Sequence, residues 1–346
     1  MFTAAQVKAR ALALGFDLCG IAAARPLDAA RLDRWLDNGW DAGLSYVRER
    51  REERLDPARL VPGARSVIAV ASSYGPRSDD PSPLPDELVV ARYARGRDYH
   101  NVMLKPVRKL AAWLRARGAA VYAEVDTGAV MEKAWAQEAG LGWIGKNGCL
   151  IHERFGSWLL LGALITDAAL EPDAPHPDRC GDCALCIPAC PTDAIREPRY
   201  VDSGRCIAYH TIEHREVIPD DVAGRAGARL FGCDACQDAC PWNRRALPGT
   251  LVQLRARTAS LPAAQVLSLT PEETRRRFEG TPLMRAARDG LVRTALAVGR
   301  ATFAEVARLV GDAAPGVREQ ARRAVQAACG KVSTAPFTAP DSGESR

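Results

Sequence analysis

The sequence predicts an α+β protein with three parts: a layered N-terminal domain, a cysteine-rich module and a helical C-terminal part. Three observations lead to this prediction. Strand-like and helix-like segments alternate up to about residue 170, eight cysteines fall within residues 180–240, and apolar residues recur at helical spacing beyond residue 284. We place the boundaries at 1–172, 173–245 and 246–331, and expect the polar, proline-dotted residues 332–346 to be disordered.

The clearest single element of the N-terminal domain is a predicted central strand over Ser66–Ser73, an apolar and β-branched run. The proline-rich stretch 75–85 predicts a loop. Further strands are predicted at 16–21, 119–125 and 157–167. Helices are predicted at 5–14, 27–50, 100–117 and 129–139.

The cysteine-rich module contains the pattern C-x2-C-x2-C-x3-C-P, which bacterial ferredoxins use to hold 4Fe–4S clusters. A second run, C-x2-C-x3-C-P, repeats its closing half, and one isolated cysteine lies between the two. In two-cluster ferredoxins the fourth cysteine of one run ligates the other cluster. The predicted ligands are therefore Cys180, Cys183, Cys186 and Cys240 for the first cluster, and Cys190, Cys206, Cys233 and Cys236 for the second.

Disulfides and structural zinc are the alternatives for these cysteines. Disulfide scaffolds are usually short secreted chains, whereas this chain has 346 residues and no apolar signal-peptide core in its first residues. Zinc suits the C-x2-C pairs but does not explain a cysteine at x3 followed by proline, twice. We therefore expect a cytoplasmic protein with two iron–sulfur clusters. The remaining cysteines, Cys19, Cys149 and Cys329, are expected to be buried free thiols.

The C-terminal part carries helical spacing at 284–298 and 303–328, which resembles one or two units of a HEAT-type helical repeat. It is also basic, because residues 241–346 hold 17 Lys and Arg against 9 Asp and Glu. A basic C-terminal part favours a polyanionic partner, although an arginine-rich surface exposed only to solvent would have the same composition. No apolar run reaches the roughly 18 residues of a membrane span, so no membrane association is expected.

Asp126 directly follows the predicted strand 119–125, at a strand end where ligands of layered α/β domains gather. A carboxylic acid there can donate a proton if burial raises its pKa. The alternative is that Asp126 caps the helix that follows, since aspartate is a preferred N-cap residue.

Two loops complete the candidate constellations. The glycine-rich stretch 140–148 lets the backbone approach a ligand and adds the cation of Lys146, but it is not a P-loop and a flexible turn is the alternative. Residues 92–100 interleave three arginines with two tyrosines, which suits an anion or a planar ring as well as a solvated basic loop.

Together these motifs resemble the epoxyqueuosine reductase family over nearly the whole chain. The resemblance rests on R-Y-A-x-G-R-D-Y-H at 92–100, the strand end at Asp126, A-G-L-G-W-x-G-K at 139–146 and the eight-cysteine module. It continues through Phe231–Gln237, Cys240–Asn243 and the stretch 280–299.

The resemblance implies a nitroreductase-like domain that binds cobalamin, a ferredoxin-like module with two 4Fe–4S clusters and a HEAT-like cap that binds tRNA. It implies reduction of epoxyqueuosine to queuosine at the wobble position of tRNA, with electrons passing through the clusters to cobalamin. Asp126 matches the family's proton donor. The cofactor is expected without its base coordinated, because the D-x-H-x-x-G signature is not met: Met103 replaces its glycine. An external low-potential electron donor and a monomeric state are also expected.

Motif position and loop chemistry indicate which residues contact the cofactor and tRNA. The expected cobalamin contacts are Asp126, Lys146, Asn147, His100, Arg97, Ser157 and Ile151. The expected phosphate contacts are Arg244, Arg245, Arg285, Arg288 and Arg293. A wobble base must leave the stack to enter a pocket, and Tyr93 or Trp242 is expected either to stack on a base or to belong to the core.

Two other functions fit parts of the pattern. A corrinoid-dependent reductive dehalogenase would share the cobalamin domain and both clusters, but would not need a basic helical cap. A non-catalytic ferredoxin-type electron carrier would need the clusters and no cobalamin.

Overall fold

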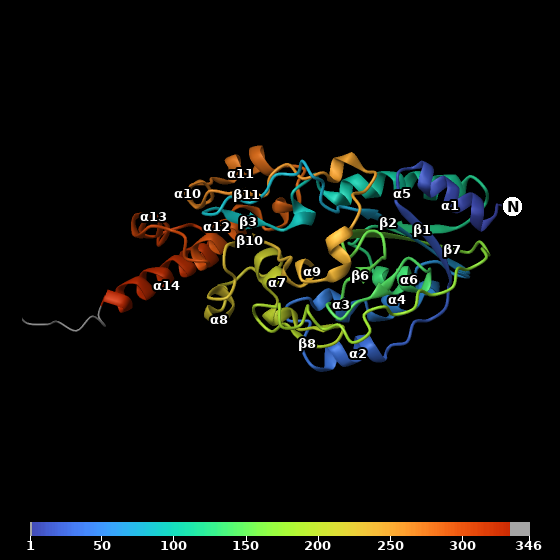
Figure 1. The fold of residues 1–346 in the computed structure, drawn as a ribbon, viewed down its shortest axis with the longest axis horizontal. Helices are drawn as coiled ribbons and strands as arrows, with labels where there is room; N and C mark the ends of the chain where they lie inside the picture. Colours follow the sequence, from blue (N-terminus) through green and yellow to red (C-terminus); the bar gives the residue numbers. More distant parts are fainter. Residues whose placement is uncertain (1, 333–346) are drawn as a thin grey trace, which may run out of the picture.

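The computed structural model describes residues 2–332, and its N-terminal half is built on a four-stranded sheet of order β1-β2-β7-β4 (Figure 1). All neighbouring strands run antiparallel, so the fold class is α+β, as expected. The strands are β1 (Leu18–Ala23), β2 (Ser66–Ser73), β7 (Leu159–Thr166) and β4 (Val121–Glu124). The central strand β2 has the predicted bounds and is buried along its whole length.

Helices cover both faces of this sheet (Figure 1). On one face, α1 (Ala4–Ala13) and α5 (Tyr99–Arg115) enclose a core that includes Ile68 and Val70 of β2. On the other face, α6 (Glu132–Glu138) packs over Val67 and Ala69 of the same strand. Alternate residues of a strand point to opposite faces, so an uninterrupted apolar run is buried on both sides.

The helix predicted over 27–50 is divided into shorter helices. The chain forms α2 (Ala30–Asp37), α3 (Ser45–Glu49) and α4 (Arg51–Leu55), the last followed by the 3-10 turn η1 (Pro57–Arg59). The break falls where Gly39 and Ala42 take left-handed backbone conformations, with φ of 67° and 51°. A residue in that conformation ends an α-helix, and Gly39 lies just past the last turn of α2.

The cysteine-rich module contains only short elements, because its apolar content is too small for a large core of its own. They are β8 (Ile195–Glu197), β9 (Tyr200–Val201), η3 (Ser203–Arg205), α7 (Ile207–Ile212), α8 (Asp220–Ala223), β10 (Arg229–Phe231), α9 (Ala235–Asp238) and η4 (Pro241–Arg245). The nearby glycine-rich stretch forms the small hairpin of β5 (Trp143–Ile144) and β6 (Leu150–Ile151).

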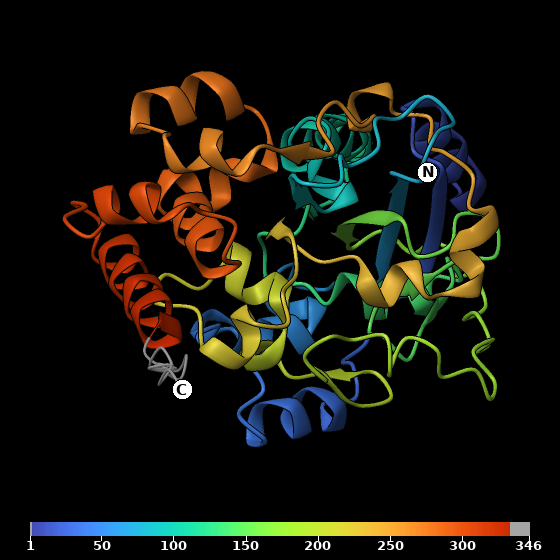
Figure 2. The same ribbon diagram turned by 60° about the vertical axis from the view of Figure 1, so that its left-hand side comes forward.

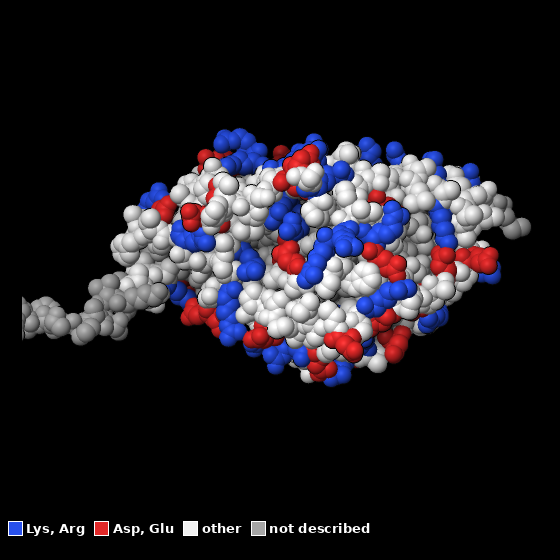
Figure 3. Space-filling model, in the orientation of Figure 1, with Lys and Arg blue, Asp and Glu red and all other residues white. Residues whose placement is uncertain are grey.

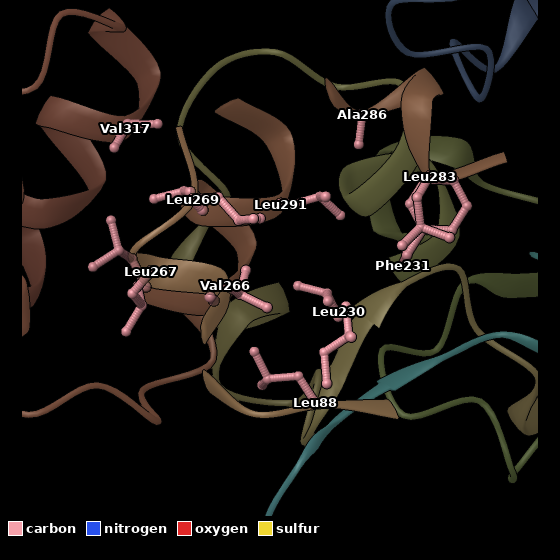
Figure 4. Close-up of a cluster of buried hydrophobic side chains, with 14 of the residues drawn as sticks. Leu88, Leu230, Phe231, Val266, Leu267, Leu269, Leu283, Ala286, Leu291 and Val317 are labelled. Atoms are coloured by element: carbon pink, nitrogen blue, oxygen red, sulfur yellow. The ribbon is translucent and has the colours of Figure 1, made fainter. Parts of the chain in front are cut away.

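A second sheet joins all three parts of the chain. It has the order β10-β3-β11, in which β3 is Leu88–Val90 and β11 is Ser260–Leu261. Leu88 from the first part packs with Leu230 and Phe231 from the second and with Leu291 from the third (Figure 4). The expected domain boundaries therefore cross a shared hydrophobic core.

The C-terminal part is helical from residue 263 onwards, and its last helices lie together at one end of the molecule (Figure 2). The helix predicted over 303–328 is two helices, because the capping box of Thr302 starts α13 and Pro315 starts α14. The elements are η5 (Val252–Leu254), α10 (Ala263–Leu267), α11 (Pro271–Phe278), η6 (Pro282–Arg285), α12 (Ala287–Ala297), α13 (Phe303–Leu309) and α14 (Pro315–Val332).

Two remaining expectations concern the end of the chain and membranes. The tail expected to be disordered lies outside the described residues beyond Val332. Within residues 2–332, no helix has the length and apolar character needed to span a bilayer.

Candidate active site and cluster module

Asp126 lies in the loop between β4 and α6, and its backbone is in the left-handed region with φ of 64°. Its backbone N–H donates to Oε1 of Glu132 at 2.7 Å. The helix α6 begins later than predicted, at Glu132, and its N-cap is Met131 without a side-chain cap. The interpretation of Asp126 as a helix cap is therefore wrong, and its carboxylate is left for other contacts.

The Asp126 carboxylate is hydrogen-bonded to two side chains at the start of α5. Tyr99 donates its hydroxyl to Oδ2 at 2.7 Å, and Nε2 of His100 lies 2.9 Å from the same oxygen. The other ring nitrogen of His100 lies 2.8 Å from Oδ1 of Asp98, the N-cap residue of α5. The rings of Tyr99 and His100 stack with their centroids 4.1 Å apart. These contacts form a Tyr99–His100–Asp126 constellation with Asp98 behind it.

The electrostatics place the proton on His100 rather than on Asp126. Burial works to raise the pKa of Asp126, but hydrogen bonds from His100 and Tyr99 outweigh it and lower the pKa. Burial works to lower the pKa of His100, yet Asp126 and Asp98 raise it to about 9. The Asp126 side chain is also 57% exposed. The expectation of a raised Asp126 pKa is therefore wrong for the described state, in which Asp126 is a carboxylate beside an imidazolium.

We expect the His100 imidazole to titrate near pH 9 in the folded protein, measured by NMR of labelled histidine. Its folded pKa lies above its ordinary value, so the stability that it contributes is complete below about pH 6.5 and is lost as pH rises towards 9. The effect of pH on Asp126 runs in the opposite direction. The stability that Asp126 contributes is complete above its ordinary pKa and is lost as pH falls through its lowered folded-state pKa. A His100 pKa near 6.5 would contradict this pairing.

Further charged and aromatic groups surround the constellation. Tyr46 of α3 is 45% exposed, and the Arg54 guanidinium lies 5.6 Å from its ring centre. Burial raises the pKa of Tyr46, and the charges of Glu213 and Asp126 add to the rise. Arg285 of η6 pairs with Glu213 at 2.8 Å on the same side. Four separate segments of the chain thus converge around Asp126.

The residues expected to bind cobalamin differ in the contacts that they make within the protein. Lys146 donates from Nζ to the carbonyl of Gly181 at 2.8 Å, which ties the glycine-rich hairpin to the first cysteine run. Asn147 is buried, and its Nδ2 has no partner within residues 2–332. Ile151 packs with Trp143 and Cys240.

Ser157 and the arginine loop are held mainly by contacts within the protein. Ser157 hydrogen-bonds through Oγ and N to Gln237 and Asn243 of the cysteine module. Arg95 is buried and donates to the carbonyl of Val90 at 2.8 Å, whereas Arg97 is exposed.

The first expected set of cluster ligands is brought together by the fold. Burial raises the pKa of the Cys186 thiol to about 11, and the nearby Cys240, Cys180 and Cys183 add to the rise. Cys240 is distant from the other three in sequence, and it reaches them because Trp242 and Ile151 pack around it with Cys180. Cys183 is the exposed member of this set.

The second expected set also gathers in one place. Burial raises the pKa of Cys206 to about 11, and the neighbouring Cys233 and Cys190 add to the rise. Burial also raises the pKa of Cys236, with Cys149 as the largest charge contribution, followed by Cys206, Cys233 and Cys190. Within residues 2–332, no three His, Cys, Asp or Glu side chains are placed to hold a single metal ion. Of the cysteines outside these sets, Cys19 and Cys149 are only partly buried, and the side chain of Cys329 lies outside the described part.

The arginines expected to contact phosphates differ sharply in exposure. Arg244 and Arg245 are exposed on η4, directly after Cys240. Arg285 is exposed and paired with Glu213. Lys and Arg side chains are spread along the visible face of the molecule rather than gathered at the C-terminal end (Figure 3).

Two of the expected phosphate contacts are structural residues instead. Arg288 is only 14% exposed and pairs with both carboxylate oxygens of Asp312, at 2.7 and 2.5 Å. Arg293 is 1% exposed, and it donates to the carbonyls of His210, His214 and Glu216. Burial lowers the pKa of Arg293 to about 10. The expectation of phosphate contacts at Arg288 and Arg293 is therefore wrong, because neither guanidinium is free to reach a ligand.

We expect Arg293→Leu to lower the free energy of unfolding by about 3 kcal/mol, because three carbonyls lose a buried donor. Denaturant unfolding of the holoprotein measures this. The matched control is Arg276→Leu, since the Arg276 side chain is 74% exposed and its unfolding free energy should change by less than about 0.5 kcal/mol. Equal stability of the two variants would show that Arg293 does not hold α12 (Ala287–Ala297) against α7.

A protein-family model described as "4Fe-4S double cluster binding domain" matches residues 179–243, which include all eight cysteines of both sets. Another, described as "Epoxyqueuosine reductase QueG, DUF1730", matches residues 54–127 and ends just after Asp126. The epoxyqueuosine reductase of Gloeobacter violaceus is 44% identical over 305 residues, which cover 85% of this chain and 94% of that protein.

This chain belongs to the epoxyqueuosine reductase family.

Solved structures of epoxyqueuosine reductases have the same fold. One, a crystal structure with an epoxyqueuosine-modified tRNA-Tyr stem loop, has a TM-score of 0.86 at 28% identity and covers 93% of this chain and 88% of its own. The enzyme from Bacillus subtilis, in a form with its catalytic aspartate loop swung out of the active site, has a TM-score of 0.79 at 26% identity. That comparison covers 98% of this chain and 95% of the Bacillus chain.

Several groups around Asp126 are not predicted by the sequence patterns. Tyr99 is predicted only as a loop tyrosine, and no motif indicates a role for Glu132, Glu124 or Tyr46. Glu132 follows Asp126 by six residues, but it touches the Asp126 backbone only because the intervening loop doubles back. Tyr46 is far from Asp126 in sequence, so only the tertiary fold could reveal it.

Proposed function

We propose that this chain reduces epoxyqueuosine to queuosine at the wobble position of tRNA. The proposal rests on one observation above all. This chain, which belongs to the family, combines the Tyr99–His100–Asp126 constellation with two neighbouring groups of cysteines. Removing the epoxide oxygen as water takes two electrons and two protons. The cysteine module would deliver the two electrons, the constellation would deliver one proton from His100, and solvent water would deliver the other.

The arrangement around Asp126 is suited to proton transfer to the epoxide oxygen. In the described state the proton is held on Nε2 of His100, against Oδ2 of Asp126, and Asp98 fixes the other ring nitrogen. Negative charge developing on the epoxide oxygen would draw the proton from Nε2 of His100 to Oδ2 of Asp126 and from there to the epoxide oxygen, so that the Asp126 carboxylate passes on a proton it takes from His100. Tyr99 keeps the carboxylate oriented through its hydroxyl. Asp126 would thus act as the donor and His100 as its reservoir.

The residues present fit cobalamin as the group that receives the electrons. Asn147 and Trp158 each have a buried N–H without a partner within residues 2–332, and such donors suit the amide groups around a corrin ring. The Asp98–His100 segment is engaged with Asp126, which leaves His100 unsuited as a cobalt ligand and is consistent with a cofactor bound without its base. When bound, cobalamin would supply the strongly reducing cobalt centre that opens the epoxide.

The two cysteine sets would each hold one 4Fe–4S cluster, with Cys190 and Cys240 crossing between the two runs. The N-terminal domain would be the nitroreductase-like, cobalamin-binding part, and the C-terminal helices the HEAT-like, tRNA-binding part. For phosphate contacts we retain Arg244, Arg245 and Arg285, which are exposed. The electrons would come from an external low-potential donor.

The test is conversion of the natural substrate. The reconstituted protein with cobalamin and a strong reductant is incubated with tRNA from cells that lack the enzyme, and the digested nucleosides are analysed by mass spectrometry. Queuosine should replace epoxyqueuosine. Absence of conversion by protein with about eight irons per chain and bound corrinoid would overturn the proposal. Iron and sulfide without any corrinoid binding would instead favour a plain electron carrier.

A further inference from the structure

The loop that carries Asp126 is held from inside the protein by two glutamates that do not reach the constellation themselves. Oε1 of Glu132 accepts the Asp126 backbone N–H at 2.7 Å. Glu124 is 5% exposed, and Tyr122 donates its hydroxyl to Oε2 of Glu124 at 2.6 Å. Both carboxylates therefore lie beneath the loop of residues 125–131.

Glu124 restrains the loop through close packing against the Gly128 backbone. A Cβ atom at position 128 would lie 0.9 Å from Oε2 of Glu124, so the carboxylate occupies the space above the Gly128 backbone. Only glycine allows this approach. The loop thus fits closely over Glu124 at one point and is hydrogen-bonded to Glu132 at another.

Glu132 fixes the conformation of Asp126 itself. A non-glycine residue with φ of 64° is in a sparsely populated region, which persists only where the surroundings over-determine it. The hydrogen bond to Glu132 supplies that restraint at the residue whose side chain meets Tyr99 and His100.

We propose that Glu132 is a positioning residue for Asp126: it accepts the Asp126 N–H and so holds the left-handed backbone that directs the carboxylate to Tyr99 and His100. Glu124 supports the same geometry through Gly128. The side chain at position 132 must place an acceptor oxygen within hydrogen-bond distance of the Asp126 N–H, because that backbone group is the donor. Charge at this position is secondary.

This inference predicts different results for two substitutions of the same size. Glu132→Gln keeps an acceptor oxygen, so kcat should stay within about threefold of the parent, and the His100 pKa should stay near 9. Glu132→Met fills the same space without an acceptor. Its kcat should fall about 10²-fold with KM for tRNA nearly unchanged, because small misplacements of a reacting group carry such costs. Its His100 pKa should fall towards 6.5 as Asp126 leaves the ring.

The His100 pKa can be measured without any catalysis, whereas the kcat measurement rests on the proposed function. The pKa measurement therefore tests the role of Glu132 even if the proposed function is wrong. Glu138→Met is the matched control on the same helix, where Glu138 pairs with Arg25 instead, and it should change neither readout. Gly128→Ala is a second variant in case Glu132→Met does not fold. It should lower both kcat and the His100 pKa, because its methyl group cannot share the space of the Glu124 carboxylate and the support that Glu124 gives the loop is lost.

Three results would overturn the inference. One is a His100 pKa near 9 in both Glu132→Met and Gly128→Ala, which would show that the constellation does not depend on the loop. Another is an unchanged kcat in both variants. The third is equal loss in Glu132→Gln and Glu132→Met, which would show that charge, rather than the acceptor, is required.

Discussion

Asp126→Asn should reduce kcat by about 10²–10⁴-fold while leaving the binding of cobalamin and tRNA intact. Asparagine has the same shape and keeps an oxygen that can accept from Tyr99, so the loop should stay in place. It cannot take a proton from His100 and pass it on. The effect should therefore appear in single-turnover nucleoside analysis, and corrinoid titration of the purified protein should be unchanged.

The matched control for Asp126→Asn is Asp37→Asn, at the exposed end of α2 (Ala30–Asp37). It removes one carboxylate from the protein and should leave kcat within about twofold, as surface changes usually do. Full activity of Asp126→Asn would remove the donor role from Asp126 and leave His100 and Tyr99 as the candidates.

Cys240→Ala should remove one cluster and abolish turnover, although Cys240 stands in the second cysteine run. The fold brings Cys240 beside Cys180, so the first cluster would lose its fourth ligand. Iron and sulfide should fall from about eight to about four per chain. Electron paramagnetic resonance of the reduced protein should show one cluster without the coupling expected of two.

Cys19→Ala is the control for the cysteine change, because Cys19 lies in β1, outside both cysteine sets. Its iron content and activity should match the parent. Retention of both clusters in Cys240→Ala would contradict the crossed ligation and require another residue to complete the first set. Cys149 would be examined next, because it neighbours both Cys236 and Cys240.

Features that depend on local sequence could be predicted from the sequence. The double-cluster module could be predicted because cluster ligation depends on cysteine spacing, and the matching family model covers all eight cysteines. Which four cysteines share a cluster stays a prediction. The buried strand β2 was equally clear, because a long β-branched run has few other stable positions in an α+β fold. Long, specific motifs likewise identified the family.

Side-chain roles that depend on burial were not evident from the sequence. Arg293 and Arg244 are both arginines in a basic segment, yet one is enclosed among carbonyls and the other is exposed. No local pattern separates them, because the carbonyls that enclose Arg293 come from α7 and the residues after it. The pKa of Asp126 was misjudged for the same reason: its sign depends on partners at the start of α5.

The sequence by itself thus determined the family through its long motifs, the α+β class through its alternating segments, and the double-cluster module through the spacing of its eight cysteines. The tertiary structure alone decided which arginines remain free, where the proton rests between His100 and Asp126, and how Glu132 holds the Asp126 loop. These features depend on distances and solvent access between segments far apart in sequence, and such distances are set only when the cores pack.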